Sequence, residues 1–273
     1  MSRDKAITNK NMKRIVIKVG SSVLTEITDI AKERMLNLAS LIAEARKQYE
    51  VILVTSGAVA AGYTAVQLNR NIPTSKKVLA SIGQPILMSS YKNKFDIFDV
   101  TISQILLTEE DFDSRVHTQI FQDIIERTLR NDILPIVNEN DISTTPDQLF
   151  GDNDQLSAHV AHYANADLLI ILSDIDGYFD KNPQEHSDAK IRKIVNEVTD
   201  EETGQAVTPN SQFATGGIVT KLKAAEYIIE NKRKMFLCSG YDLTAARDFL
   251  IEGVHNKGTL FQAKESNETK MKK

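Results

Sequence analysis

The sequence predicts an α/β protein, an α/β/α sandwich around a mainly parallel sheet. Two observations predict this class: short β-branched runs alternate with amphipathic stretches, and the runs are almost continuously apolar. A strand that is apolar at every position is covered on both faces, which is the usual environment of a parallel strand. Alternation of strands and helices along most of a chain is typical of a doubly wound sheet.

Six runs predict strands. They are expected at residues 14–19, 51–54, 100–107, 133–137, 168–172 and 235–238. Charged segments flank the pattern, so residues 1–13 and 262–273 are expected to be polar tails. The folded part is then one domain over 14–261, with a weak boundary near residue 165 between a first lobe and a second.

Three segments between the strands carry helical spacing, because their apolar residues recur every three or four positions. They are 31–49, 75–97 and 114–130. The apolar face of 31–49 is marked by Met35, Leu38, Ile42, Ala45 and Tyr49. That of 114–130 is marked by Ile120, Ile124 and Leu129. In 75–97, Pro85 should kink or break the helix.

Composition excludes several classes. The chain has 273 residues with 33 Lys plus Arg and 37 Asp plus Glu, a net charge of −4 that disfavours nucleic acid as a partner. No apolar run reaches the ~18 residues of a membrane helix, and the polar N-terminus lacks a secretory signal. The single cysteine, Cys238, excludes an internal disulfide framework. We therefore expect a soluble, cytoplasmic protein.

The first predicted strand contains Lys18 and ends in Gly20-Ser21-Ser22. An ammonium inside an apolar strand is costly unless it faces an anion, and the turn offers donors for a phosphate. The alternative is a lysine at the sheet edge whose ammonium extends to water. After the second strand, Ser56-Gly57 either brings backbone close to a ligand or provides a helix cap.

Polar groups also follow the later strands. Residues 138–141 (Asn-Glu-Asn-Asp) suit the amino and carboxylate groups of an amino acid, although a plain polar loop explains them too. Asp154 stands at a helix start, where it either complements the helix dipole or orients lysines. On the same helix, His159 and His162 lack a third metal ligand, so core or solvent positions are favoured.

The segment Thr215–Lys221 places paired glycines and a lysine at a helix start, a pattern that favours phosphates, although it is not a Walker A loop. Lysines, glycine turns and acids at strand ends together suit phosphoryl transfer.

In this order, the segments KVGSS, VTSGAVAAG, NENDIS, GDNDQLSA, LSDIDGYFDKNP and TGGIVTKLKAA resemble the amino acid kinase family, from about Arg14 to Phe261. The resemblance is to the glutamate-phosphorylating branch. It implies ATP-dependent phosphorylation of the L-glutamate γ-carboxylate to γ-glutamyl phosphate, the first step of proline biosynthesis, with Mg²⁺. It further implies a homodimer or homotetramer, feedback inhibition by proline, and handover of the product to glutamyl phosphate reductase.

The resemblance also implies a role for each matched residue. Lys18 and Lys221 would be the catalytic cations, and Asp154 would orient both. Glutamate would be held by Ser56, Asp141 and Asn153, with Gly57 and Asn138 nearby. ATP would be bound by Lys18, Ser173, Asp174, Thr215, Gly216, Gly217, Ile218, Val219, Thr220 and Lys221. No side chain is implied as a metal ligand.

The sequence departs from the family pattern at three points. Ala214 replaces a glycine, Ser173 replaces a threonine, and after Phe261 there is no room for the RNA-binding-like module of many bacterial members. Two alternatives stay open. One is a family member that acts on carbamate, N-acetylglutamate, aspartate or UMP. The other is a non-catalytic sensor of glutamate or proline, which should have lost Lys18, Lys221 or Asp154.

Overall fold

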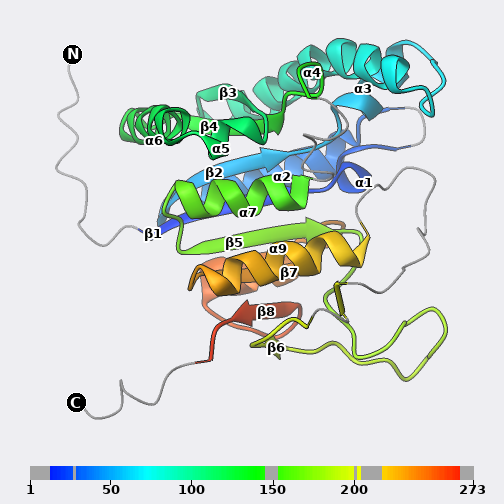
Figure 1. Ribbon diagram of the computed structural model, residues 1–273, viewed down its shortest axis with the longest axis vertical. Helices are drawn as coiled ribbons and strands as arrows, with labels where there is room; N and C mark the ends of the chain where they lie inside the picture. Colours follow the sequence, from blue (N-terminus) through cyan, green and yellow to red (C-terminus); the bar gives the residue numbers. More distant parts are fainter. Residues whose placement is uncertain (1–12, 27–28, 145–152, 200–201, 204–216, 265–273) are drawn as a thin grey trace.

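A single eight-stranded sheet, in the order β3-β4-β2-β1-β5-β7-β8-β6, forms the centre of the molecule (Figure 1). The computed structural model describes residues 13–26, 29–144, 153–199, 202–203 and 217–264. Neighbouring strands are parallel except β7 and β8. The predicted α/β/α sandwich around a mainly parallel sheet is confirmed.

All six predicted strands form, each boundary lying within two residues of the prediction. The strands are β1 (Lys13–Val19), β2 (Tyr49–Thr55), β3 (Ile102–Leu107), β4 (Leu134–Glu139), β5 (Leu168–Ser173), β6 (Ile194–Val195), β7 (Lys234–Ser239) and β8 (Thr259–Gln262). The prediction missed β6 and β8, which have 2 and 4 residues and are too short for a periodic signal. Lys13 and Gln262, expected in the tails, pair with Tyr49 and Lys234 as the outermost strand residues.

Helices cover both faces of this sheet. They are α1 (Ser21–Leu24), α2 (Lys32–Ala45), α3 (Ala58–Ala65), α4 (Pro73–Phe95), α5 (Glu110–Asp113), α6 (Arg115–Arg130), α7 (Asn153–Tyr163), α9 (Ile218–Glu230) and α10 (Thr244–Arg247), with short helical turns η1 (Asp96–Phe98) and η2 (Asp248–Glu252). The three helices predicted from apolar spacing correspond to α2, α4 and α6. The helix starts expected at Asp154 and at the segment ending in Lys221 correspond to α7 and α9. The prediction extended α2 too far, because Tyr49 is the first residue of β2.

Pro85 does not break α4, which runs for 23 residues through it. Proline removes one backbone hydrogen bond, to the carbonyl four residues earlier, here that of Ser81. Ser81 and Pro85 are both exposed. The freed carbonyl therefore lies on the side of the helix that water can reach, and the expected break is wrong for this reason.

The apolar face of α6 differs from the expected one. Phe121 and Ile125 are the buried residues, whereas Ile120 is 51% exposed and Ile124 45% exposed. Ser114 caps the helix by accepting from the His117 backbone N–H. The helix was thus predicted in the right place, but its buried face was assigned one residue too early. Adjacent apolar residues repeat along α6, and only Phe121 and Ile125 of these pairs are buried.

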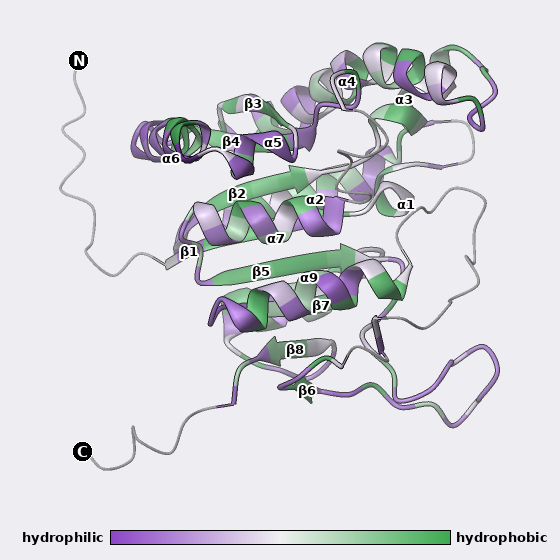
Figure 2. Cartoon of the chain, viewed as in Figure 1, coloured by the Kyte–Doolittle hydropathy of each residue, from purple (hydrophilic) through white to green (hydrophobic). Residues whose placement is uncertain are grey.

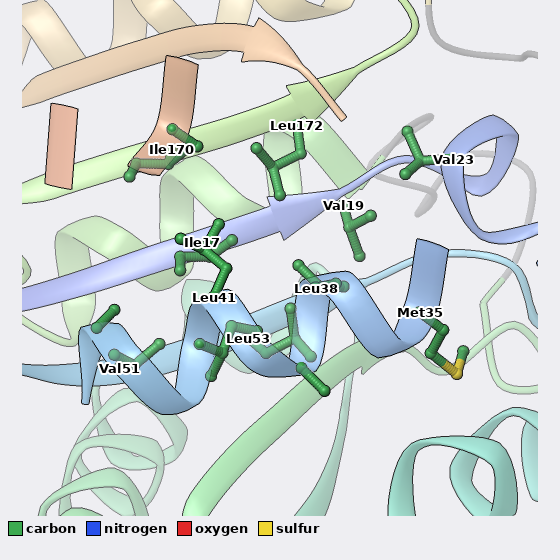
Figure 3. Packing of buried hydrophobic residues seen from close by; sticks show 14 of the residues in the cluster. Ile17, Val19, Val23, Met35, Leu38, Leu41, Val51, Leu53, Ile170 and Leu172 are labelled. Carbon is green, nitrogen blue, oxygen red and sulfur yellow. The ribbon is translucent and has the colours of Figure 1, made fainter. Parts of the chain in front are cut away.

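Alternate residues of β1 divide the core into two layers. Ile15, Ile17 and Val19 pack with α2 on one face of the sheet, and Figure 3 shows Ile17 and Val19 close to Leu38 and Leu41. Val16 points to the opposite layer, where α7 and α9 lie. In Figure 2 the inner strands β2 and β5 are hydrophobic along their length, whereas hydrophobic and hydrophilic residues alternate along the helices. Lys18 shares the face of Val16, since side chains alternate along a strand.

Within the described part of the chain, every helix is too short or too polar to cross a lipid bilayer.

Candidate active site

Three charged side chains meet beneath the first turns of α7 and α9. Lys18 comes from β1, Asp154 from the start of α7 and Lys221 from the first turns of α9. Lys18 Nζ contacts Asp154 Oδ1, and Lys221 Nζ lies 3.1 Å from Asp154 Oδ2. The side chain of Asp154 is fully buried and that of Lys18 is 3% exposed. The structure thus excludes the alternative that Lys18 extends to water.

Charge balance explains why the carboxylate stays ionised. Burial alone raises the pKa of Asp154, but the charges and hydrogen bonds of Lys18 and Lys221 outweigh it and hold that pKa well below its ordinary value. Among the described residues, two ammonium groups, those of Lys18 and Lys221, thus contact one carboxylate, so positive charge gathers at this point. A buried cluster of this sign is suited to a polyanion such as a chain of phosphates.

Local sequence places each member of this cluster. Strand alternation turns Lys18 toward α7 and α9, as described above. The N-terminus of α9 follows Gly217, and Thr220 Oγ1 donates to Asp154 Oδ2 at 3.0 Å. Thr220 therefore links the first turn of α9 to the carboxylate. Backbone N–H groups at the start of α7 and of α9 are free of intrahelical partners and add positive potential here.

The carboxyl end of β5 borders the same region. Ser173 is buried and its hydroxyl donates to Asp174 Oδ1 at 2.9 Å, whereas Asp174 is exposed. Of the predicted nucleotide loop, residues 217–221 are described and begin α9. Thr215 and Gly216 lie outside the described residues, as does Ala214. The described half of the loop therefore joins the Lys18–Asp154–Lys221 cluster.

A set of amides occupies the neighbouring strand ends, on the side of β2 and β4. The Asn153 amide nitrogen donates to the Thr55 carbonyl oxygen and, at 2.8 Å, to Asn138 Oδ1. Asn138 and Asn153 are both buried. Asn153 immediately precedes Asp154, so one helix start contributes both to the amides and to the charged cluster.

Asp141 follows β4 in a turn that is held by Lys77. Lys77 Nζ donates to the carbonyl oxygens of Ile142 at 3.0 Å and Thr144 at 2.5 Å. Burial raises the pKa of Asp141, and the nearby charges of Lys76 and Lys77 offset part of that rise. A desolvated carboxylate at this position is suited to a cationic group such as an ammonium.

Ser56 and Gly57 form the junction of β2 and α3. Gly57 is the N-cap of α3 with φ of +103°, a conformation that favours glycine, and no side chain caps the helix there. The cap interpretation of Ser56 is therefore wrong, and its half-buried hydroxyl stays available at the strand end.

The side chains of His159 and His162 pack into an aromatic cluster. His159 stacks on Tyr227 with ring centroids 4.5 Å apart.

Sequence reasoning missed the contribution of α4. Lys77, Gln84 and Tyr91 lie seven residues apart, so they share one face of the helix. Lys77 holds the Asp141 turn, Gln84 accepts from Asn138 at 2.8 Å, and the Tyr91 hydroxyl lies 2.7 Å from Thr55 Oγ1. A polar residue at every seventh position of a predicted helix was the signal that pointed to this face.

The sheet order, the helix-start cations and the amide-lined strand ends define a phosphotransferase-like α/β site. The family model described as the amino acid kinase family matches residues 13–239, and the chain belongs to that family. Its relatives include proteins named glutamate 5-kinase. That of Wolinella succinogenes is 52% identical, covering 92% of this chain and 98% of its own. That of Leishmania donovani is 47% identical, covering 94% and 98%.

Solved structures agree on the fold. The isopentenyl phosphate kinase of T. acidophilum in a product complex gives a TM-score of 0.64 at 14% identity, covering 91% of this chain and 99% of that one. Carbamate kinase from Giardia lamblia bound to AMP-PNP gives 0.64 at 15% identity, covering 93% and 99%. At these identities the likeness establishes the amino acid kinase fold alone.

Proposed function

We propose that this protein is a glutamate 5-kinase, which transfers the γ-phosphoryl group of ATP to the γ-carboxylate of L-glutamate and so begins proline biosynthesis. The observation that carries the proposal is the buried cluster of Lys18, Asp154 and Lys221 beside an amide-lined strand edge. Sequence identity of 52% and 47% to relatives named glutamate 5-kinase, over nearly the whole chain, supports the same acceptor.

The reaction needs no general base. A glutamate side chain has a pKa near 4.3, so its carboxylate is already the nucleophilic anion at neutral pH. One carboxylate oxygen attacks the γ-phosphorus, the bond from that phosphorus to the β,γ-bridging oxygen breaks, and ADP leaves with the electron pair. The obstacle is the approach of one anion to another. Lys18 and Lys221 offset that repulsion and stabilise charge on the migrating group.

The residues divide between the two substrates. We assign the half of the sheet from β1 to β3, residues 14–165, to glutamate, and the half from β5 to β8, residues 166–261, to ATP. Asp141 and Asn153 face the α-ammonium, and Ser56, Gly57 and Asn138 surround the rest of the amino acid. Ser173, Asp174 and residues 215–221 surround the nucleotide.

Mg²⁺ fits the nucleotide side of this arrangement. Among the described residues, no three His, Cys, Asp or Glu side chains gather into a metal site. A magnesium ion bound mainly by nucleotide phosphates needs no such group, and Asp174 offers an exposed carboxylate directly after β5. The ion would supply charge neutralisation on the phosphates.

A second copy of the chain is the proposed partner at the outer edge of the sheet. Val116, Ile120 and Ile124 form an exposed apolar stripe along α6, and β3 is the edge strand of the described sheet. Both features favour self-association. Light scattering of wild type and of Ile120→Asp tests the dimer.

Three further proposals follow from the proposed pathway. They are inhibition by proline, a reductase that consumes γ-glutamyl phosphate, and a cytoplasmic location.

Turnover of ATP with L-glutamate, Mg²⁺ and hydroxylamine tests the function. Hydroxylamine converts an acyl phosphate to a stable hydroxamate. Aspartate, N-acetylglutamate, carbamate and UMP run in parallel, with ADP release measured for each. Hydroxamate from glutamate at a rate well above the others supports the proposal. ADP release only with another acceptor would show that this other compound, not glutamate, is the substrate. No ADP release with any acceptor, together with glutamate binding in calorimetry, would indicate a sensor.

A further inference from the structure

We infer that Gln84 is a positioning residue for the acceptor substrate, which acts together with the Glu139 backbone N–H and the Thr55 carbonyl to fix the direction in which Asn138 and Asn153 present their amide groups. This inference rests on the proposed function only in naming glutamate as that substrate. Gln84 lies on α4, outside every segment in which the sequence placed site residues.

An unbroken chain of amides connects Gln84 to the site. Gln84 Nε2 donates to Gln104 Oε1 at 2.9 Å, and Gln84 Oε1 accepts from Asn138 Nδ2 at 2.8 Å. Asn138 Oδ1 in turn accepts from Asn153 Nδ2 at 2.8 Å. The chain begins on the edge strand β3, crosses α4 and β4, and ends at α7.

Each link fixes the orientation of the next. A primary amide has a donor end and an acceptor end, so reversing one amide would place two donors or two acceptors face to face. Asn138 Oδ1 also accepts from the Glu139 backbone N–H at 2.9 Å, which agrees with the same orientation. Gln84 supplies the acceptor that holds the opposite, Nδ2 end of Asn138.

The orientation determines what the substrate meets. Asn153 Nδ2 uses both of its hydrogens, on Asn138 and on the Thr55 carbonyl oxygen. The side-chain atom left for a ligand is Oδ1, an acceptor. Together with the carboxylate of Asp141, this gives the site acceptors that suit an ammonium group, whereas a reversed Asn153 would offer it a donor.

The backbone around Gln84 is held in place by close packing of α4 against α3. A Cβ at the neighbouring Gly83 would lie 1.7 Å from the Ala58 carbonyl oxygen, and one at Gly62 would lie 1.9 Å from that of Leu79. Helices α3 and α4 therefore touch at their backbones, and α3 begins directly after Ser56 and Gly57. Two glycines thus hold Gln84 at a fixed distance from the strand ends that it serves.

Three variants test the inference. Gln84→Met removes the acceptor at similar length, Gln84→Glu retains it, and Gln104→Met removes only the outer link. In Gln84→Glu, we expect the exposed side-chain amide of Gln104 to flip, so that its NH₂ group donates to the new carboxylate. We expect Gln84→Met to raise KM for glutamate about tenfold, with KM for ATP within twofold. KM for glutamate in Gln84→Glu should recover to within about threefold of wild type. In Gln104→Met it should stay within twofold, because Gln104 is exposed and water replaces it as the acceptor for Gln84 Nε2.

A merely structural role would give a different result. Three results would overturn the inference. In Gln84→Met, they are an equal rise of KM for glutamate and for ATP, or an unchanged KM for glutamate. In Gln84→Glu, it is a rise of KM for glutamate as large as that in Gln84→Met. Side-chain amide signals of Asn138 and Asn153 in ¹H–¹⁵N spectra provide a readout independent of activity. They should shift in Gln84→Met and not in Gln104→Met. If wild type fails to phosphorylate glutamate while these shifts occur, the proposed function fails and the positioning role stands; unshifted signals contradict it.

Discussion

Lys18 and Lys221 bind different oxygens of one buried carboxylate: Lys18 contacts Asp154 Oδ1, and Lys221 contacts Oδ2 at 3.1 Å. The two ammonium groups come from opposite ends of the chain, one from a central strand and one from a helix start. Asp154 therefore bridges the two ammonium groups inside the protein. In the function proposed above, the pair would be a cationic clamp of the kind that phosphoryl transfer requires.

Asp154→Asn should disable the clamp while keeping its shape. Without the carboxylate, the two buried ammonium groups lose the counter-charge that they share, which should lower the free energy of unfolding by about 3 kcal/mol. Turnover should fall at least about 100-fold. ATP should recover part of the lost thermal stability, because its phosphates replace the missing charge. Wild-type turnover in this variant would contradict the assignment of Asp154.

Lys221→Ala should reduce kcat by about 100-fold or more without unfolding the protein, as for loss of an electrostatic stabiliser. Lys223→Ala is the matched control, since Lys223 lies two residues further along α9 and is exposed. Its kcat should match that of wild type. Steady-state kinetics and circular dichroism of both variants check this pair, and equal kinetics would remove Lys221 from the mechanism.

Asp141→Ala should raise KM for glutamate by at least tenfold and leave KM for ATP nearly unchanged. In wild type, burial raises the pKa of Asp141, so this carboxylate takes up a proton at a higher pH than an ordinary aspartate. Glutamate binding should therefore weaken as pH falls toward that raised pKa, with no such loss above it. In Asp141→Asn the loss of binding should begin only at lower pH, where the substrate carboxylate, with a pKa near 4.3, itself takes up a proton. A pH profile of KM for each substrate measures both effects, and a loss that begins at the wild-type pH in Asp141→Asn would argue against this role.

Lys77→Met should raise KM for glutamate about three- to tenfold. The reason is that Lys77 donates to two carbonyl oxygens of the turn that carries Asp141. Lys76→Met removes a neighbouring charge without breaking a hydrogen bond to this turn, so it serves as the control and should have the smaller effect. The opposite ranking would show that charge at this site matters more than the position of the turn.

Acid should destabilise the protein through His159. Burial, with the charge of His162 adding to it, lowers the pKa of His159 from 6.5 to about 4. Between those values the unfolded chain binds the extra proton, so stability is full above about pH 6.5 and falls as pH drops toward 4, by about 2 kcal/mol. His159→Phe keeps the stacking on Tyr227 and should flatten the profile.

The exposed His117 provides a control for this prediction, since His117→Gln should keep the wild-type slope. Urea denaturation at a series of pH values gives the comparison. Parallel profiles for wild type and His159→Phe would exclude His159 as the source.

Sequence patterns predicted the sheet and the charged cluster for clear physical reasons. Buried parallel strands are continuous apolar runs, and a lysine within one, Lys18, is conspicuous because burial of an ammonium requires a partner. The pairing of Lys18 with Asp154 could not be derived from spacing alone. It depends on α7 and β1 being adjacent, which only the packed fold establishes.

Other features left weak signals or none. Phe121 and Ile120 are adjacent apolar residues, and the choice of which one is buried depends on how α6 lies on the sheet. The role of Gln84 depends on the backbone contact between α3 and α4 at Gly62 and Gly83. The helix α4 also continues through Pro85 against the local preference of proline, because the freed Ser81 carbonyl lies on the side that water can reach.

One isotope experiment tests the central claim, that the glutamate carboxylate itself attacks the γ-phosphorus between the two lysines. The wild-type protein is supplied with unlabelled ATP and with glutamate carrying ¹⁸O in both γ-carboxylate oxygens, in the presence of hydroxylamine. Hydroxylamine attacks the acyl carbon, so the bridging oxygen leaves with phosphate. We predict one ¹⁸O atom in each phosphate released with hydroxamate. Phosphate without the label would mean that water attacked ATP, and would contradict the mechanism.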